Sequence, residues 1–94
     1  MFITLYAYHA NPDRLDRIQV LYREWQSLLR AWPAAATELL SNPQDPAELI
    51  MLACFPDEDS AWSAAESAGH CAWYARLVGL AEAGPTVAHY EVLA

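Results

Sequence analysis

Residues 2–9, FITLYAYH, alternate between two sets of side chains, and both sets are largely apolar. Phe2 and the tyrosines occupy the even positions, while Ile3 and Leu5 stand between them. A run rich in aromatic and β-branched residues is typical of a β-strand, and apolar residues on both sides indicate that both faces are covered. A second run, ELIMLACF at residues 48–55, is almost continuously apolar, which predicts a central strand.

A helix-start signal and a helical repeat follow the first strand. Asn11 caps free amides and Pro12 fits the first helical position. Apolar residues then recur at alternating steps of three and four, which predicts an amphipathic helix ended by Pro33. The residues of this stripe are Leu15, Ile18, Leu21, Tyr22, Trp25, Leu28, Leu29 and Trp32.

The rest of the chain supplies two more strands and a second helix. Asp57 is the expected cap of that helix, Gly69 interrupts it, and Gly84 with Pro85 ends it. We expect the break at Gly69 to turn His70 towards the space between helices and sheet. The remaining segments are a short strand, ATELL at 36–40, a turn, SNPQDP at 41–46, and a last strand, TVAHYEVL at 86–93.

This order predicts the α+β class, with a ferredoxin-like βαββαβ arrangement, a four-stranded antiparallel sheet and both helices on one face. The length of 94 residues predicts a single domain over residues 1–94. Helices can cover only one face of such a sheet, yet the first and third strands are apolar on both. We therefore expect a homodimer in which two sheets pack face to face as a dimeric α+β barrel.

Charge restricts the partners. The formal net charge is −7, lysine is absent, and four of the five arginines share one predicted helix with acidic residues. Nucleic acid and acidic membrane surfaces are therefore unexpected partners, because both need a surplus of basic charge. No apolar run approaches the ~20 residues of a membrane span, and the start lacks the basic region of a signal peptide. These features predict a soluble, cytoplasmic protein.

Chemical motifs are few. Cys54 and Cys71 lack CxxC spacing, which favours two reduced thiols, although a disulfide between them stays open. His9, His70 and His89 are not spaced like zinc ligands, so no metal is expected. The chain has no nucleophile elbow, phosphate-binding loop or dinucleotide fingerprint, so we expect no cofactor.

The region around the second helix resembles a known motif. A strand ends at Phe55, a polar turn PDED follows, and Trp62 provides an aromatic residue. Ala65 stands where the motif has its first histidine, and His70 matches the second. Together with the element order, this resembles the dimeric α+β barrel superfamily and, within it, the antibiotic-biosynthesis-monooxygenase-like family.

The resemblance implies a cofactor-independent monooxygenase, or an isomerase, acting on a small aromatic or polyketide-like molecule in a helix–sheet cleft. His70 is the candidate proton-transfer group, because the ordinary pKa of histidine lies near neutral pH. The alternative is a non-catalytic homodimer that binds a small ligand or has a structural role, with the aromatic residues filling the core. The candidate pocket residues are Tyr6, Tyr8, Trp25, Trp62 and Trp73.

Overall fold

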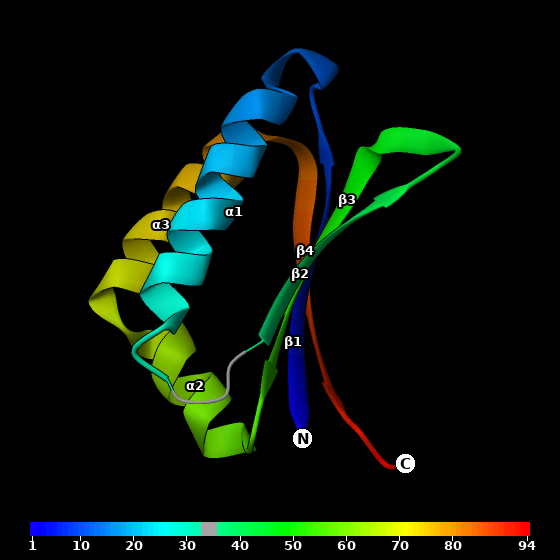
Figure 1. Cartoon of the computed structure of the whole chain (residues 1–94). Coiled ribbons are helices and arrows are strands. Elements are labelled where there is room, and N and C mark those ends of the chain that lie inside the picture. Colours follow the sequence, from blue (N-terminus) through cyan, green and yellow to red (C-terminus); the bar gives the residue numbers. More distant parts are fainter. Residues whose placement is uncertain (33–35) are drawn as a thin grey trace.

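The computed structural model describes residues 1–32 and 36–94. Its strands form one antiparallel sheet in the order β2-β3-β1-β4, and the helices lie on one side of it (Figure 1). The predicted α+β, ferredoxin-like fold is confirmed. The elements are β1 (Phe2–Ala10), a 3-10 turn (Pro12–Arg14), α1 (Leu15–Leu29), β2 (Ala36–Asn42), β3 (Asp45–Phe55), α2 (Glu58–Glu66), α3 (Ala68–Leu80) and β4 (Ala81–Glu91).

The two faces of the sheet follow directly from the alternation seen in the sequence. On β1 the even residues from Thr4 to Ala10 are buried beneath the helices, whereas Phe2 and the odd residues are only partly buried. Leu5 pairs with Leu52 of β3 and with Ala88 of β4, so these three side chains share the face away from the helices. We call this surface the open face. Its central residues are Ile3, Leu5, Ala7, Ile50, Leu52, Cys54 and Ala88.

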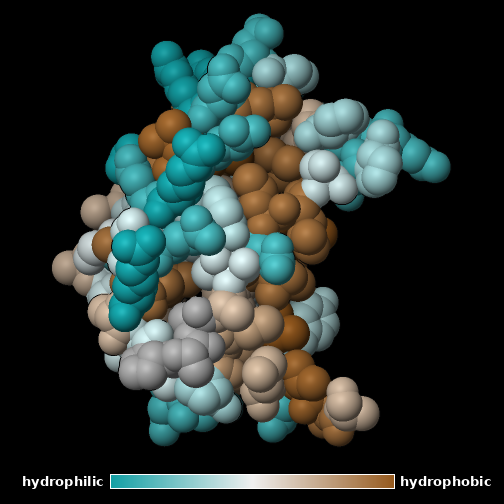
Figure 2. All heavy atoms as spheres, in the orientation of Figure 1, coloured by the Kyte–Doolittle hydropathy of each residue, from teal (hydrophilic) through white to brown (hydrophobic). Residues whose placement is uncertain are grey.

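Hydrophobic side chains dominate the open face. Figure 2 shows them gathered on the side away from the helices, in a hollow between the hydrophilic β2–β3 hairpin and the C-terminal end of the chain. The opposite face carries the core, whose largest fully buried side chains are Trp25, Ile18, Leu21, Met51 and Leu77. None of the helices in the described residues combines the length and the apolar character that a membrane crossing requires.

The predicted cap at Asp57 is confirmed for α2, whereas Asn11 caps the 3-10 turn that leads into α1 and not α1 itself. The Asn11 side chain accepts a hydrogen bond from the Asp13 amide at 3.0 Å, and Asp57 accepts one from the Ser60 amide at 2.7 Å. α1 ends at Leu29. Pro33, the predicted end of that helix, lies outside the described residues.

The break in the second helix lies at Ser67, so its predicted position at Gly69 is wrong. Ser67 has extended backbone angles (φ −65°, ψ 145°), and its hydroxyl accepts a hydrogen bond from the His70 amide. It therefore ends α2 and caps α3. Gly69 lies within the first turn of α3, where an added Cβ would stand 3.1 Å from Leu28 Cδ2. Its small size allows α3 to approach α1 closely.

Two other boundaries also differ from the prediction. β2 extends to Asn42 and β3 begins at Asp45, so the turn between them is shorter than residues 41–46. α3 ends at Leu80, and β4 already includes Gly84, which was expected to end the helix. Gly84 has φ +89°, and its Cβ would lie 3.0 Å from the backbone oxygen of Ala7. The pairing of β1 with β4 shifts register nearby, which is typical of a β-bulge.

Candidate functional site

The candidate site is built around a hydrogen-bonded pair, Tyr6 on β1 and His70 on α3. The Tyr6 hydroxyl oxygen and His70 Nε2 lie 3.1 Å apart, and the two residues are only 4% and 5% exposed. The alternation along β1 turns Tyr6 towards the helices. The Ser67 cap begins α3 so that His70 lies in its first turn. Packing of α3 on the sheet thus joins residues that are 64 positions apart.

Burial sets the charge state of the pair. It lowers the pKa of His70 below its ordinary value, because a charged imidazolium would lose its hydration. Burial also raises the pKa of the Tyr6 hydroxyl, and the nearby Tyr74 and Cys71 add to this effect. At neutral pH the pair is therefore a neutral imidazole hydrogen-bonded to a neutral phenol, an arrangement that can transfer a proton.

The pair lies in the wall of a cleft between α2, α3, β1 and β4. The cleft has a volume of about 330 Å³ and is lined by Tyr6, Trp62, Ala65, His70, Cys71, Tyr74, Val87 and His89. Trp62 and Val87 are 41% and 42% exposed, so the cleft opens to solvent along the edge strand β4. Its lining is mainly aromatic and apolar with a few polar groups, which is typical of sites for small organic molecules.

His89 is a cleft residue that the sequence reasoning did not select as a pocket candidate. Its Nδ1 lies 3.2 Å from the hydroxyl oxygen of Thr4, its partner across the β1–β4 pairing. Its ring centroid lies 4.6 Å from that of Trp62. The signal was present in the alternation of the last strand, because Val87 and His89 share one face. Only the pairing register with β1 places that face towards the helices.

The predicted pocket residues fall into two groups. Tyr6 and Trp62 line the cleft together with His70. Tyr8, Trp25 and Trp73 are instead buried core residues that do not line it. The rings of Trp25 and Trp73 stack with centroids 5.3 Å apart, and both pack edge-on against Tyr6. Trp73 Nε1 also donates a hydrogen bond to the Leu21 carbonyl at 2.8 Å.

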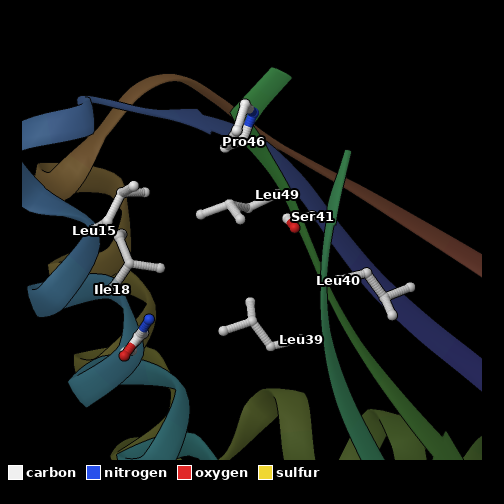
Figure 3. Close-up of a pocket in the computed structure, with 8 residues that line it drawn as sticks. Leu15, Ile18, Leu39, Leu40, Ser41, Pro46 and Leu49 are labelled. Atoms are coloured by element: carbon white, nitrogen blue, oxygen red, sulfur yellow. The ribbon is translucent and has the colours of Figure 1, made fainter. Parts of the chain in front are cut away.

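A second cleft, of about 280 Å³, lies between α1 and the β2–β3 hairpin. Figure 3 shows Ile18 facing Leu39 and Leu49 across this space, while Leu40 points away from it. The other residues that line it are Leu15, Gln19, Ser41 and Pro46. This set contains no group that titrates near neutral pH, so the second cleft offers no acid–base chemistry.

The cysteines and histidines do not assemble into a metal centre in the described part of the chain. Within residues 1–32 and 36–94, no three His, Cys, Asp or Glu side chains lie close enough to hold a metal ion. Cys54 and Cys71 are free thiols. Cys54 lies on the open face, paired with Ile3 across β1 and β3, whereas Cys71 lines the cleft beside His70.

The fold and the cleft define an α+β protein of the ferredoxin-like class with a cleft between helices and sheet. No protein-family model matches the chain, and no curated protein matches it. Solved structures do. A "putative antibiotic biosynthesis monooxygenase" from Nitrosomonas europaea superimposes with a TM-score of 0.84, at 15% identity, covering 100% of both chains.

Two further solved structures share this fold. A protein of the same name from Deinococcus radiodurans has a TM-score of 0.86 at 11% identity, covering 100% of this chain and 94% of its own. A third, named antibiotic biosynthesis monooxygenase, has a TM-score of 0.82 at 18% identity, with both chains fully covered. The resemblance found in the sequence is thereby confirmed at the level of the fold. Identities this low carry information about the fold alone.

Proposed function

We propose that this protein is a cofactor-independent monooxygenase that takes a small, flat aromatic or polyketide-like molecule into the cleft beside Tyr6 and His70. The observation that carries the proposal is the buried Tyr6–His70 hydrogen bond in the wall of an aromatic cleft. A fold shared with proteins named as antibiotic biosynthesis monooxygenases supports it. The cleft lining named above contains no Asp, Glu, Lys or Arg, which favours a neutral substrate over an anion.

In the proposed reaction the substrate itself provides the electrons for oxygen. A CH₂ group next to a phenol or ketone loses a proton to the Tyr6–His70 pair, leaving an enolate. The enolate reduces O₂ and forms a C–O bond, giving a hydroperoxide at that carbon once a proton is returned. Loss of water then leaves a carbonyl, so CH₂ and O₂ become C=O and H₂O. The protein has only to orient, desolvate and move protons.

The pair acts as one proton acceptor in this scheme. A proton that arrives at the Tyr6 oxygen releases the hydroxyl proton of Tyr6 to His70 Nε2, 3.1 Å away. Tyr6 then never becomes an anion, in keeping with its raised pKa. His70 becomes charged only while the enolate is present, and the two opposite charges stabilise each other across the short distance between them.

A non-catalytic protein that binds the same kind of ligand is the second candidate. The observation that favours it is Ala65, which lines the cleft where the related motif has a histidine. The cleft would then hold its ligand by stacking and hydrogen bonds without turnover.

Oxygen uptake separates the two candidates. Purified protein is incubated with anthrones, naphthols and hydroquinones while dissolved O₂ is recorded, and binding is followed by tryptophan fluorescence, since Trp62 lines the cleft. We expect turnover that His70→Ala abolishes and that His9→Ala, a histidine outside the cleft, retains. Ligand binding without O₂ uptake by the unmodified protein would favour the binding protein instead. Neither binding nor uptake across the panel would reject both.

We also infer that two copies pair through their open faces, in a reducing, cytoplasmic setting. Leu5, Ile50 and Leu52 form an apolar centre that no element of the described chain covers, and burying one leucine contributes about 1.5–3 kcal/mol. A two-fold axis would let the same surface serve both copies. The free thiols of Cys54 and Cys71 support the reducing setting.

Sedimentation at micromolar concentration tests the pairing. We expect a dimer for the unmodified chain and a folded monomer for Leu52→Glu, because a charge would be buried at the centre of the interface. Val20→Glu is the matched control, since Val20 is 49% exposed on α1, away from the open face. A well-ordered monomer of the unmodified chain would refute the pairing.

A further inference from the structure

A second, much smaller cavity borders the Tyr6–His70 pair, and we call it the inner cavity. Its volume is about 10 Å³, close to the smallest space that holds one water molecule. Its lining consists of Thr4, Tyr6, Trp25, Leu29, Phe55, Ala61, Ala64, Ala65 and His70. Tyr6, Ala65 and His70 also line the cleft. The hydrogen-bonded pair therefore borders both the solvent-open cleft and this inner cavity.

Trp25, in the wall of this cavity, has a donor without an acceptor. The residue is 1% exposed, and its Nε1 makes no hydrogen bond within the described residues. Trp73, which stacks on it, is as deeply buried but donates to a backbone carbonyl. A buried donor left unpaired is unfavourable, and such groups in proteins are commonly satisfied by an internal water.

We propose that the inner cavity binds a single water molecule that accepts a hydrogen bond from Trp25 Nε1 and donates one to the Tyr6 oxygen. Three observations support this site together: a volume that fits one water, the unpaired donor of Trp25, and two hydroxyl-bearing residues, Thr4 and Tyr6, among those that line the cavity. Thr4 provides a further partner, since its hydroxyl has acceptor capacity beyond its contact with His89.

The water would determine which way the Tyr6 hydroxyl points. When the Tyr6 oxygen accepts from the water, its own hydrogen is free to donate to His70 Nε2. His70 is then held with its proton on Nδ1 and with Nε2 as acceptor, the form required of a base. Trp25 thus acts as a positioning residue through the water. The positioning role of Trp25 in catalysis rests on the proposed function, whereas the water site itself does not.

The occupant is a water and not dioxygen. Dioxygen is a poor hydrogen-bond acceptor and would leave the indole donor of Trp25 unpaired, whereas a water has both lone pairs and protons to offer. Tyr8 shows that the argument is specific to this cavity. Its hydroxyl also lacks a partner within the described residues, but Tyr8 does not line this cavity, and we assign no water to it.

Direct measurements on the unmodified protein test the site. We expect a crystal structure at high resolution to show one ordered water within hydrogen-bond distance of Trp25 Nε1. We expect the Trp25 indole proton to give a cross-peak to a long-lived water in NMR spectra, and the Trp73 indole proton to give none. An empty cavity together with no such cross-peak would overturn the proposal.

A variant pair tests the link to His70. The ¹⁵N shifts of the His70 imidazole report which nitrogen carries the proton. In Trp25→Phe we expect those shifts to move towards a mixture of the two tautomers, whereas in Trp73→Phe they stay as in the unmodified protein. Unchanged shifts in folded Trp25→Phe would refute the positioning role. No substrate enters any of these measurements, so a negative oxygen-uptake result would reject the proposed function without affecting them.

Discussion

Replacing His70 by glutamine changes how stability depends on pH. The ordinary pKa of histidine is 6.5, and burial lowers the pKa of His70 in the folded protein. Between that lowered value and 6.5 the unfolded chain binds a proton that the folded protein does not. The folded state therefore loses stability as pH falls through this window, by up to about 1.4 kcal/mol per pH unit for one proton. Above pH 6.5 the effect is absent.

Glutamine is the matched replacement because its side chain can still hydrogen-bond the Tyr6 hydroxyl but does not titrate. The assay is urea unfolding at fixed protein concentration from pH 7.5 down to 5, followed by far-ultraviolet circular dichroism. Subtracting the two curves cancels the contribution of the acidic residues. We expect the unmodified protein to lose stability relative to His70→Gln below pH 6.5 only. Parallel curves over this range would show that the imidazole is not held neutral, and the account of the pair would fail.

Three further predictions concern the cap, a glycine and the opposite pH effect. Ser67→Ala removes the cap of α3, and we expect urea unfolding to show a loss of about 1 kcal/mol. Gly84→Ala places a side chain at φ +89° and should destabilise by about 1–2 kcal/mol. Its control, Gly79→Ala, meets no atom within 4 Å and should stabilise α3 by about 0.5–1 kcal/mol in the same assay. The pKa of His9 is raised by its hydrogen bond to Asp45. That contribution is present below pH 6.5 and declines as pH rises through the raised pKa, so His9→Gln should flatten this decline in a stability–pH profile.

The sequence was sufficient for the fold because its main features are local. Alternation placed Tyr6 and Leu5 on opposite faces of β1, and the caps at Asn11 and Asp57 follow from side chains that satisfy the first amides of a helix. The helix break was predicted at Gly69, and not at Ser67, because glycine by itself is a strong signal for the interruption of a helix. At Gly69 its small size serves contact with α1, and the nearby Ser67 provides the cap.

The candidate site was harder to predict from the sequence, because it depends on contacts between segments that are far apart in the chain. Helical spacing identifies Trp25, Trp62 and Trp73 equally as apolar positions, and only packing decides that Trp62 reaches the cleft. The position of His89 in the cleft depends on the register of β4 against β1, and the bulge near Gly84 shifts that register. Neither the packing of the helices nor the register of β4 against β1 can be read from local periodicity.

Ser67, the single extended residue between α2 and α3, makes them two separate helices, and each contributes a different part of the cleft wall. α2 contributes Trp62 at the cleft entrance, whereas α3 carries His70 and the buried core residue Trp73. Sequence changes along α2 can therefore reshape the entrance of the cleft while the Tyr6–His70 pair stays where β1 and α3 hold it, and under the proposed function they would alter which molecules fit. A library restricted to the exposed positions of α2 would explore ligand selectivity at little risk to folding.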